Sequence, residues 1–170
     1  MTYFAAALAR TVDGWTGREL DFEDIEDIED LADALRDLSG DDGGTALLLF
    51  EENDEYVAVV RVDGGAGSLD EPRVFLSDRR AVLASDVAAM LWEDADLAPV
   101  DEEDEDDDED EGTRPVAEPV GDAALLSDLG TSASGLLDLC AEEGLLPADV
   151  LTGVAERGGF LDVLDGLREG

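Results

Sequence analysis

Eleven consecutive carboxylates, from Asp101 to Glu111, constrain the fold of this chain more than any other feature. Neighbouring charges in such a run lie closer together than the Debye length of about 8 Å, so salt does not screen their repulsion. The run contains no apolar side chain whose burial would offset the entropy lost on ordering. Gly112, Pro115 and Pro119 follow it and interrupt regular structure. We therefore expect an acidic disordered linker over residues 93–119, between one unit at 1–92 and a second at 120–170.

The whole chain is strongly acidic. It carries 47 acidic residues against ten arginines, a net charge of −37, and it has neither lysine nor histidine. A surface of this charge repels nucleic-acid phosphates and anionic lipids, so we expect no direct nucleic-acid partner and no membrane partner. No stretch approaches the roughly 20 apolar residues that span a bilayer, and no basic leader precedes the first apolar run. With one cysteine, which suits a reducing compartment, these features predict a cytoplasmic protein.

Apolar periodicity in the first unit predicts a mixture of strands and helices. The predicted strands cover residues 3–11, 15–22, 47–50, 56–62 and 73–76. A helical period predicts one helix over 28–38, and Ser77 or Asp78 is expected to cap a second. The order is ββαβββα. Its short connections favour an α+β fold, an antiparallel sheet with helices packed on one side.

The second unit, residues 120–170, is predicted to be a small helical unit. Its segment Leu136–Gly159 has the outline of a helix–turn–helix. A DNA-binding helix–turn–helix needs basic residues that contact the phosphates. This segment contains one basic residue, Arg157, and five acidic residues. The outline therefore indicates packing between helices.

The sequence argues against most kinds of catalytic or metal site. Without histidine there is no Ser-His-Asp triad and no histidine-ligated metal, and with Cys140 alone there is no disulfide and no four-cysteine zinc site. The stretch Gly65–Asp70 lacks the third glycine of a dinucleotide-binding loop. The acidic run lacks the glycine and glutamate spacing of a calcium loop. We therefore predict no catalytic residue, no cofactor, no metal site and no enzymatic activity.

Five side chains are candidates for an interaction surface. Arg73, Arg79 and Arg80 flank a predicted strand end and helix start, where they would either clamp an anion or pair with nearby acidic residues. Trp15 and Trp92 lie near the ends of predicted elements, as interface anchors or as packing residues.

Four segments together resemble a known family. They are YFAAALART from Tyr3, YVAVVRVD from Tyr56, PRVFLSD from Pro72 and PVGDAALLSDLG from Pro119. In this order they resemble the tRNA adenosine deaminase-associated proteins of actinobacteria. The resemblance implies association with such a deaminase, and it carries no active-site residue onto this chain. The deaminases themselves use a zinc site with H-x-E and P-C-x-x-C motifs, which a chain without histidine does not contain.

The leading hypothesis is a non-catalytic accessory or adaptor protein that binds a protein partner, with a tRNA adenosine deaminase as the candidate. The physical reason is charge, because a tRNA-binding enzyme has a basic surface that attracts an acidic partner. Two alternatives stay open. One is an acidic nucleic-acid mimic that inhibits a tRNA-binding enzyme; the other is an uncharacterised enzyme that uses carboxylates or arginine.

Overall fold

The structure, a computed structural model, describes residues 3–39, 44–52, 55–63, 72–78, 81, 85–95, 119–141 and 146–169. Several predictions fall on other parts of the chain. The acidic run, the loop at 65–70, Arg79 and Arg80 lie outside the described residues, and so does the side chain of Trp92.

Six strands form the sheet. They are β1 (Tyr3–Thr11), β2 (Gly14–Glu19), β3 (Ala46–Glu52), β4 (Tyr56–Val62), β5 (Arg73–Leu76) and β6 (Val120–Gly121). The spatial order is β2-β1-β3-β4-β5-β6, and every neighbouring pair is antiparallel. This confirms the predicted α+β class. The short strand β6 was not predicted, because two residues give no period to recognise.

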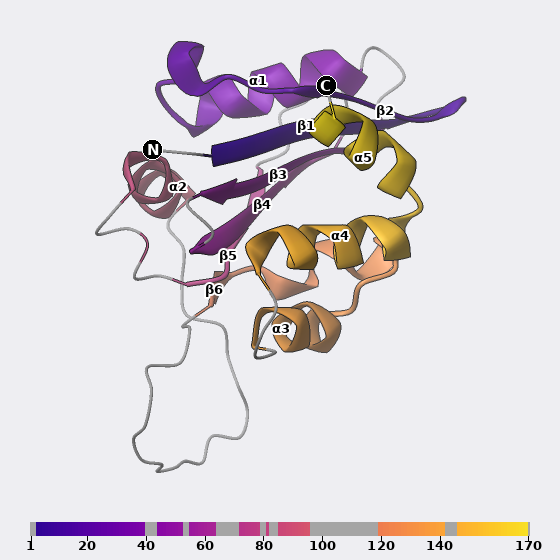
Figure 1. Ribbon diagram of the computed structural model, residues 1–170. Helices are drawn as coiled ribbons and strands as arrows, with labels where there is room; N and C mark the ends of the chain where they lie inside the picture. Colours follow the sequence, from indigo (N-terminus) through magenta and orange to yellow (C-terminus); the bar gives the residue numbers. More distant parts are fainter. Residues whose placement is uncertain are drawn as a thin grey trace.

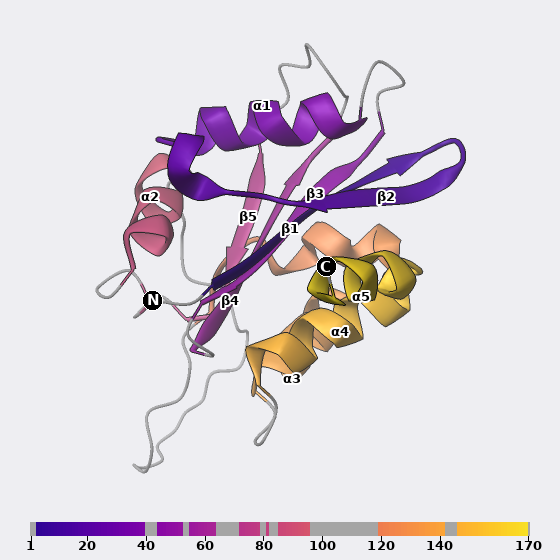
Figure 2. The same ribbon diagram turned by 45° about the horizontal axis from the view of Figure 1, so that its top comes forward.

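Helices cover both faces of the sheet. They are η1 (Phe22–Asp24), α1 (Ile28–Ser39), α2 (Asp86–Ala95), η4 (Ala123–Leu129), α3 (Ala133–Ala141), α4 (Pro147–Gly158) and α5 (Leu161–Glu169), of which η1 and η4 are 3₁₀ helices. Figure 1 shows α1 on one side of the sheet and α3, α4 and α5 on the other, and Figure 2 shows the same two layers from a second direction. We call these the α1 face and the α4 face.

Each face has its own apolar core. The α1 face buries Ala5, Ala7, Leu31, Leu35, Leu48, Phe50, Tyr56, Val60 and Leu76, among others. The α4 face buries Ala6, Leu8, Leu47, Leu49, Val59, Phe75, Leu126, Leu151 and Phe160, among others. Because both faces are covered, β3 and β4 are apolar along nearly their whole length and do not alternate with polar residues.

The expected cap of the second helix was wrong. Helix α2 begins at Asp86, and the side chain of Ser85 accepts a hydrogen bond from the backbone N–H of Ala88 at 3.2 Å. Ser77 instead accepts from the backbone N–H of Val57 at 3.0 Å, beyond the end of β5. Both serines precede apolar residues at helical spacing, so sequence pattern alone did not separate them.

None of the helices in the part of the chain that the structure describes is long and apolar enough to cross a membrane.

Candidate interaction surface

The most acidic described surface runs from the end of β2 along α1. Nine of the seventeen residues from Asp21 to Asp37 are acidic, and only Arg36 is basic. The apolar stripe of α1 faces the sheet through Ile28, Leu31 and Leu35, which turns the intervening carboxylates to solvent. Eight carboxylate side chains are exposed: Asp21, Glu23, Glu26, Asp27, Glu29, Asp30, Asp33 and Asp37. We call this surface the acidic ridge.

Some carboxylates of the ridge accept hydrogen bonds from nearby backbone N–H groups. Asp21 Oδ1 accepts from the N–H of Glu23 at 2.9 Å and caps η1. Asp27 Oδ1 accepts from the N–H of Asp30, and Asp30 Oδ2 accepts from the N–H of Glu26, a reciprocal arrangement at the start of α1. Acidic residues in this first turn also suit the positive end of the helix dipole. These aspartates therefore have a local structural role.

The other ridge carboxylates have no such role. Asp33 lies 3.5 Å from Nη1 of Arg36, and the Asp33 side chain is 76 % exposed. An exposed pair of this kind contributes little to stability. Glu23, Glu26, Glu29 and Asp33 are therefore available to an external partner without loss of a cap.

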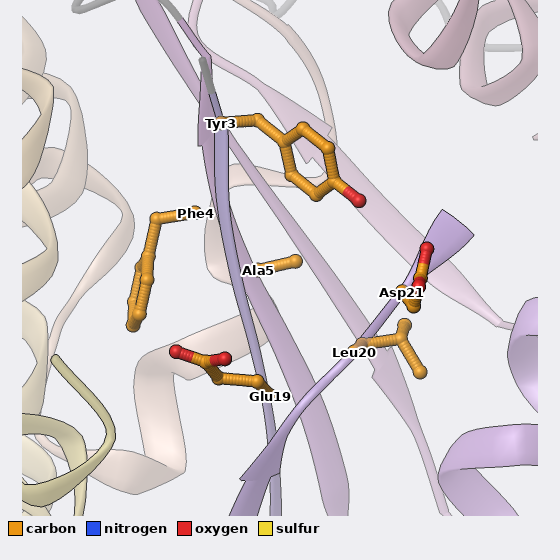
Figure 3. Close-up of a pocket in the computed structure, with 6 residues that line it drawn as sticks. All are labelled: Tyr3, Phe4, Ala5, Glu19, Leu20 and Asp21. Carbon is orange, nitrogen blue, oxygen red and sulfur yellow. The ribbon is translucent and has the colours of Figure 1, made fainter. Parts of the chain in front are cut away.

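A pocket lies beside the start of the ridge, where the chain leaves β2 (Figure 3). It has a volume of about 320 Å³ and is lined by Tyr3, Phe4, Ala5, Glu19, Leu20 and Asp21. Figure 3 shows Tyr3 and Asp21 on one side of β1 and Phe4 and Glu19 on the other. Each face of the sheet therefore contributes one aromatic ring and one carboxylate to the lining at this edge of β1.

The aromatic walls of the pocket are held by neighbours. The Tyr3 ring packs against the rings of Phe22 and Phe50, with centroids 5.8 and 5.7 Å away. On the other side, the Arg168 guanidinium lies over the Phe4 ring, 5.7 Å from its centroid. The backbone N–H of Leu20 donates to the carbonyl oxygen of Ala5 at 2.9 Å and holds the residue after β2 against β1.

An ion pair between the buried Arg61 and the exposed carboxylate of Asp128 joins the sheet to η4 on the α4 face. Arg61 donates from Nη1 to Asp128 Oδ1 at 2.6 Å and from Nη2 to Asp128 Oδ2 at 3.0 Å. The same guanidinium donates to the carbonyl oxygen of Leu125 and to Asp63. Its hydrogen bond lowers the pKa of Asp128 to about 2. These hydrogen bonds from a strand side chain hold η4, residues 123–129, against the sheet.

A second polar cluster is buried on the α1 face. Tyr56 donates its hydroxyl hydrogen to Glu52 Oε1 at 2.8 Å, and the hydroxyl of Ser85 donates to the same oxygen at 2.5 Å. The exposed fractions of Glu52, Tyr56 and Ser85 are 3 %, 4 % and 6 %. Burial raises the pKa of Tyr56 well above its ordinary value. Because Ser85 also caps α2, the cluster joins α2 to the end of β3.

Two of the predicted interaction residues, Arg73 and Trp15, contact other residues of the same chain. Arg73 Nε lies 2.7 Å from Asp122 Oδ2, and both side chains are partly exposed. Trp15 packs on Phe160, with ring centroids 4.7 Å apart, and so joins the outer strand β2 to the segment between α4 and α5. The structure does not bring Trp15 and Arg73 into one site, since β2 and β5 are separated by three strands.

Cys140 lies on α3, half-buried and packed against the core of the α4 face. Burial raises the pKa of this thiol to about 12, so it is protonated near neutral pH. Among the described residues, no group of three or more acidic or cysteine side chains is arranged to hold a metal ion.

Neither the ridge nor the two polar clusters around Arg61 and Glu52 were predicted from the sequence. The ridge was visible as nine acidic residues within seventeen, but the charge was counted over whole units. Arg61 gave a weaker signal, an arginine inside a strand otherwise apolar on both faces. Its partner lies 67 residues further along the chain, a distance at which no spacing rule applies.

Fold and surface together define an acidic α+β protein whose sheet is closed on one side by its own C-terminal helices. The chain belongs to the Rv3753c-like tRNA adenosine deaminase-associated protein family, whose model matches residues 3–161. It is 29 % identical over 161 residues to Protein Rv3753c of Mycobacterium tuberculosis, an alignment that covers 95 % of this chain and 84 % of that protein. No solved structure gives a significant match. The family description names association with a deaminase and not deaminase activity itself.

Proposed function

We propose that this protein is a non-catalytic accessory protein that binds a tRNA adenosine deaminase. The observation that carries the proposal is the family match over residues 3–161, nearly the whole chain. The absence of histidine from the sequence supports the same role, because the zinc and proton-transfer chemistry of these deaminases uses an H-x-E motif.

The acidic ridge is the surface that we propose for the contact. A deaminase that holds tRNA must present arginine and lysine side chains to the phosphates. The carboxylates of the ridge are complementary to such a surface and would raise the rate of encounter. Four of them, Glu23, Glu26, Glu29 and Asp33, are exposed and cap nothing, so they are the side chains expected to meet the partner.

The test compares two sets of four neutralised carboxylates. The ridge variant carries Glu23→Gln, Glu26→Gln, Glu29→Gln and Asp33→Asn. The control variant carries Asp138→Asn, Glu156→Gln, Asp165→Asn and Glu169→Gln, which are exposed positions on α3, α4 and α5. With up to about 1 kcal/mol for each exposed pair, we expect the ridge variant to bind the deaminase of the same organism at least tenfold more weakly at low salt. Equal affinities for the two variants would exclude the ridge, and no binding by the wild-type protein would exclude the proposed function.

A second candidate function follows from the same charge. An acidic surface that occupies the tRNA site of the deaminase would inhibit the enzyme as a nucleic-acid mimic. Deamination of tRNA, measured with and without this protein, separates the two roles. A mimic competes with tRNA, so it raises the apparent KM for tRNA at unchanged kcat. An accessory protein bound elsewhere does not compete with tRNA, so it does not raise this KM in that way.

For the acidic run at 101–111 we propose the role of a spacer. Its replacement by a neutral Gly/Ser segment of equal length should then leave partner affinity unchanged at two salt concentrations. A loss of more than about tenfold confined to low salt, roughly 1.4 kcal/mol, would instead make this run part of the binding surface.

A further inference from the structure

We propose that the pocket beside β2 receives an arginine side chain of the protein partner. The proposal rests on the proposed function for the identity of the partner. The kind of side chain that the pocket binds is inferred from the residues that line it.

The lining matches a guanidinium group. On each side of β1 the pocket pairs an aromatic ring with a carboxylate, Tyr3 with Asp21 and Phe4 with Glu19 (Figure 3). A planar cation is attracted both to the faces of aromatic rings and to carboxylate oxygens. Ala5 and Leu20, on the Tyr3 and Asp21 side of β1, offer apolar contact to the methylene groups of a long side chain.

The carboxylates have free capacity for such a ligand. Within the described part of the chain, Glu19 has no hydrogen-bond or ion-pair partner, and its side chain is exposed. Asp21 uses one oxygen, Oδ1, to cap η1. A carboxylate accepts several hydrogen bonds, so the cap leaves Asp21 able to accept from a guanidinium as well.

The chain itself shows that one of these rings accepts a guanidinium. Arg168 lies over Phe4 at 5.7 Å, held there by its hydrogen bonds to Thr152 Oγ1 and to the carbonyl oxygen of Ala148. Among the described residues, no arginine stacks on Tyr3, whose side of β1 adjoins the acidic ridge through Asp21. An arginine from a basic partner therefore meets the Tyr3 and Asp21 side first.

Arginine fits better than lysine for a geometric reason. The guanidinium is flat and weakly hydrated, so it stacks on a ring while its N–H groups reach a carboxylate in the same plane. An ammonium group is a compact, strongly hydrated charge and loses more solvation in a partly apolar pocket. A pocket of about 320 Å³ is at the small end of ligand sites, which suits one side chain.

The first experiment titrates the full-length protein with N-acetylarginine amide and follows backbone amide resonances. The control probe is N-acetylcitrulline amide, which has nearly the same shape and no charge. We expect shifts at Tyr3, Phe4, Glu19 and Asp21 with the arginine probe, and affinity at least about fivefold weaker with citrulline. Shifts spread evenly along the ridge, or equal shifts with both probes, would overturn the proposal.

The second experiment measures the affinity of the deaminase for a double variant, Glu19→Gln with Asp21→Asn. Both changes keep size and shape, and asparagine keeps the cap of η1. The control is Asp138→Asn with Glu156→Gln, which removes the same charge from α3 and α4. We expect at least about fivefold weaker binding for the pocket variant and no change beyond about twofold for the control.

The outcomes separate the two proposals. If the wild-type protein does not bind the deaminase, the proposed function fails and the arginine titration still decides the chemistry of the pocket. If the deaminase binds the pocket variant and the wild-type protein equally well, the pocket proposal fails and the proposed function stands.

Discussion

The two faces of the sheet are closed by segments of different origin. Helix α1 lies between β2 and β3 in the chain and covers the strands next to it in sequence. The opposite face is covered by η4, α3, α4 and α5, all of which follow β6 at the far end of the chain. The α1 face holds a buried carboxylate with two hydroxyl donors, and the α4 face holds an ion pair between Arg61 and Asp128.

The difference shows which contacts are local and which are not. The α1 face is built mainly from β1, β3, β4, β5, α1 and α2, which follow one another in the chain, so the loops it closes cost less entropy. The α4 face requires residues 120–169 to return to the sheet, and a directed ion pair fixes their position.

Removal of the C-terminal segment should have the largest effect. A chain that ends at residue 95 exposes Leu8, Leu47, Leu49, Val59 and Phe75, all of them 0 % exposed in the full protein. At about 1.5–3 kcal/mol for each side chain, this loss is comparable with the 5–15 kcal/mol that stabilises a typical domain. We expect no cooperative urea transition by circular dichroism, and recovery of one when a fragment of residues 119–170 is added. Cooperative unfolding of 1–95 alone as a monomer would contradict this and support a domain boundary at residue 92.

Core deletions on the two faces should be large and independent. Leu31 on α1 and Leu151 on α4 are both 0 % exposed. We expect Leu31→Ala and Leu151→Ala each to lower the free energy of unfolding by about 2–5 kcal/mol. Because the sheet separates the two side chains, the double variant should lose the sum within about 0.5 kcal/mol. A coupling above about 1 kcal/mol, from urea unfolding of all four proteins, would show that the faces do not act separately.

The ion pair should give the α4 face a distinct acid sensitivity. Because Arg61 lowers the pKa of Asp128 to about 2, below the ordinary value of about 3.9, its contribution is full above pH ~4 and is lost as the pH falls toward 2. Asp128→Asn should cost about 1–2 kcal/mol at pH 7, since Arg61 keeps Asp63 and the Leu125 carbonyl as partners. The difference between wild type and variant should shrink between pH 4 and 2. A difference independent of pH over that range would contradict the ion-pair role.

The polar cluster of the α1 face should respond to alkali instead. The pKa of Tyr56 is raised by burial, so its contribution is full below the unfolded value of about 10 and is lost as the pH rises above it. Tyr56→Phe should cost about 1 kcal/mol at neutral pH and should lessen the fall in stability above pH 10. Urea unfolding at pH 7 and above pH 10 measures both effects, and the half-buried Cys140 thiol is present in both proteins. An identical alkaline loss in the two proteins would show that Tyr56 ionises without penalty.

Much of the first unit followed from periodicity. Leu31, Leu35 and their neighbours repeat at the spacing of a helix, and Tyr56–Val62 is an apolar run that only a strand covered on both faces explains. The cap of α2 did not follow, because Ser77 and Ser85 are equivalent by pattern and differ only in what surrounds them. The pocket did not follow either, since Tyr3 and Asp21 meet only after β2 has paired with β1 and departed from it.

Propensity, period and charge are properties of short segments or of composition, so most of the elements, the acidic charge and the family could be read from the sequence. The tertiary structure was needed to show that η4, α3, α4 and α5 close the second face of the sheet and that Arg61 pairs with Asp128. It also decided that Glu19 and Asp21 flank a pocket with two aromatic rings. These arrangements depend on contacts between residues far apart along the chain. Their free energy comes from burial and charge pairing in three dimensions, which no local pattern records.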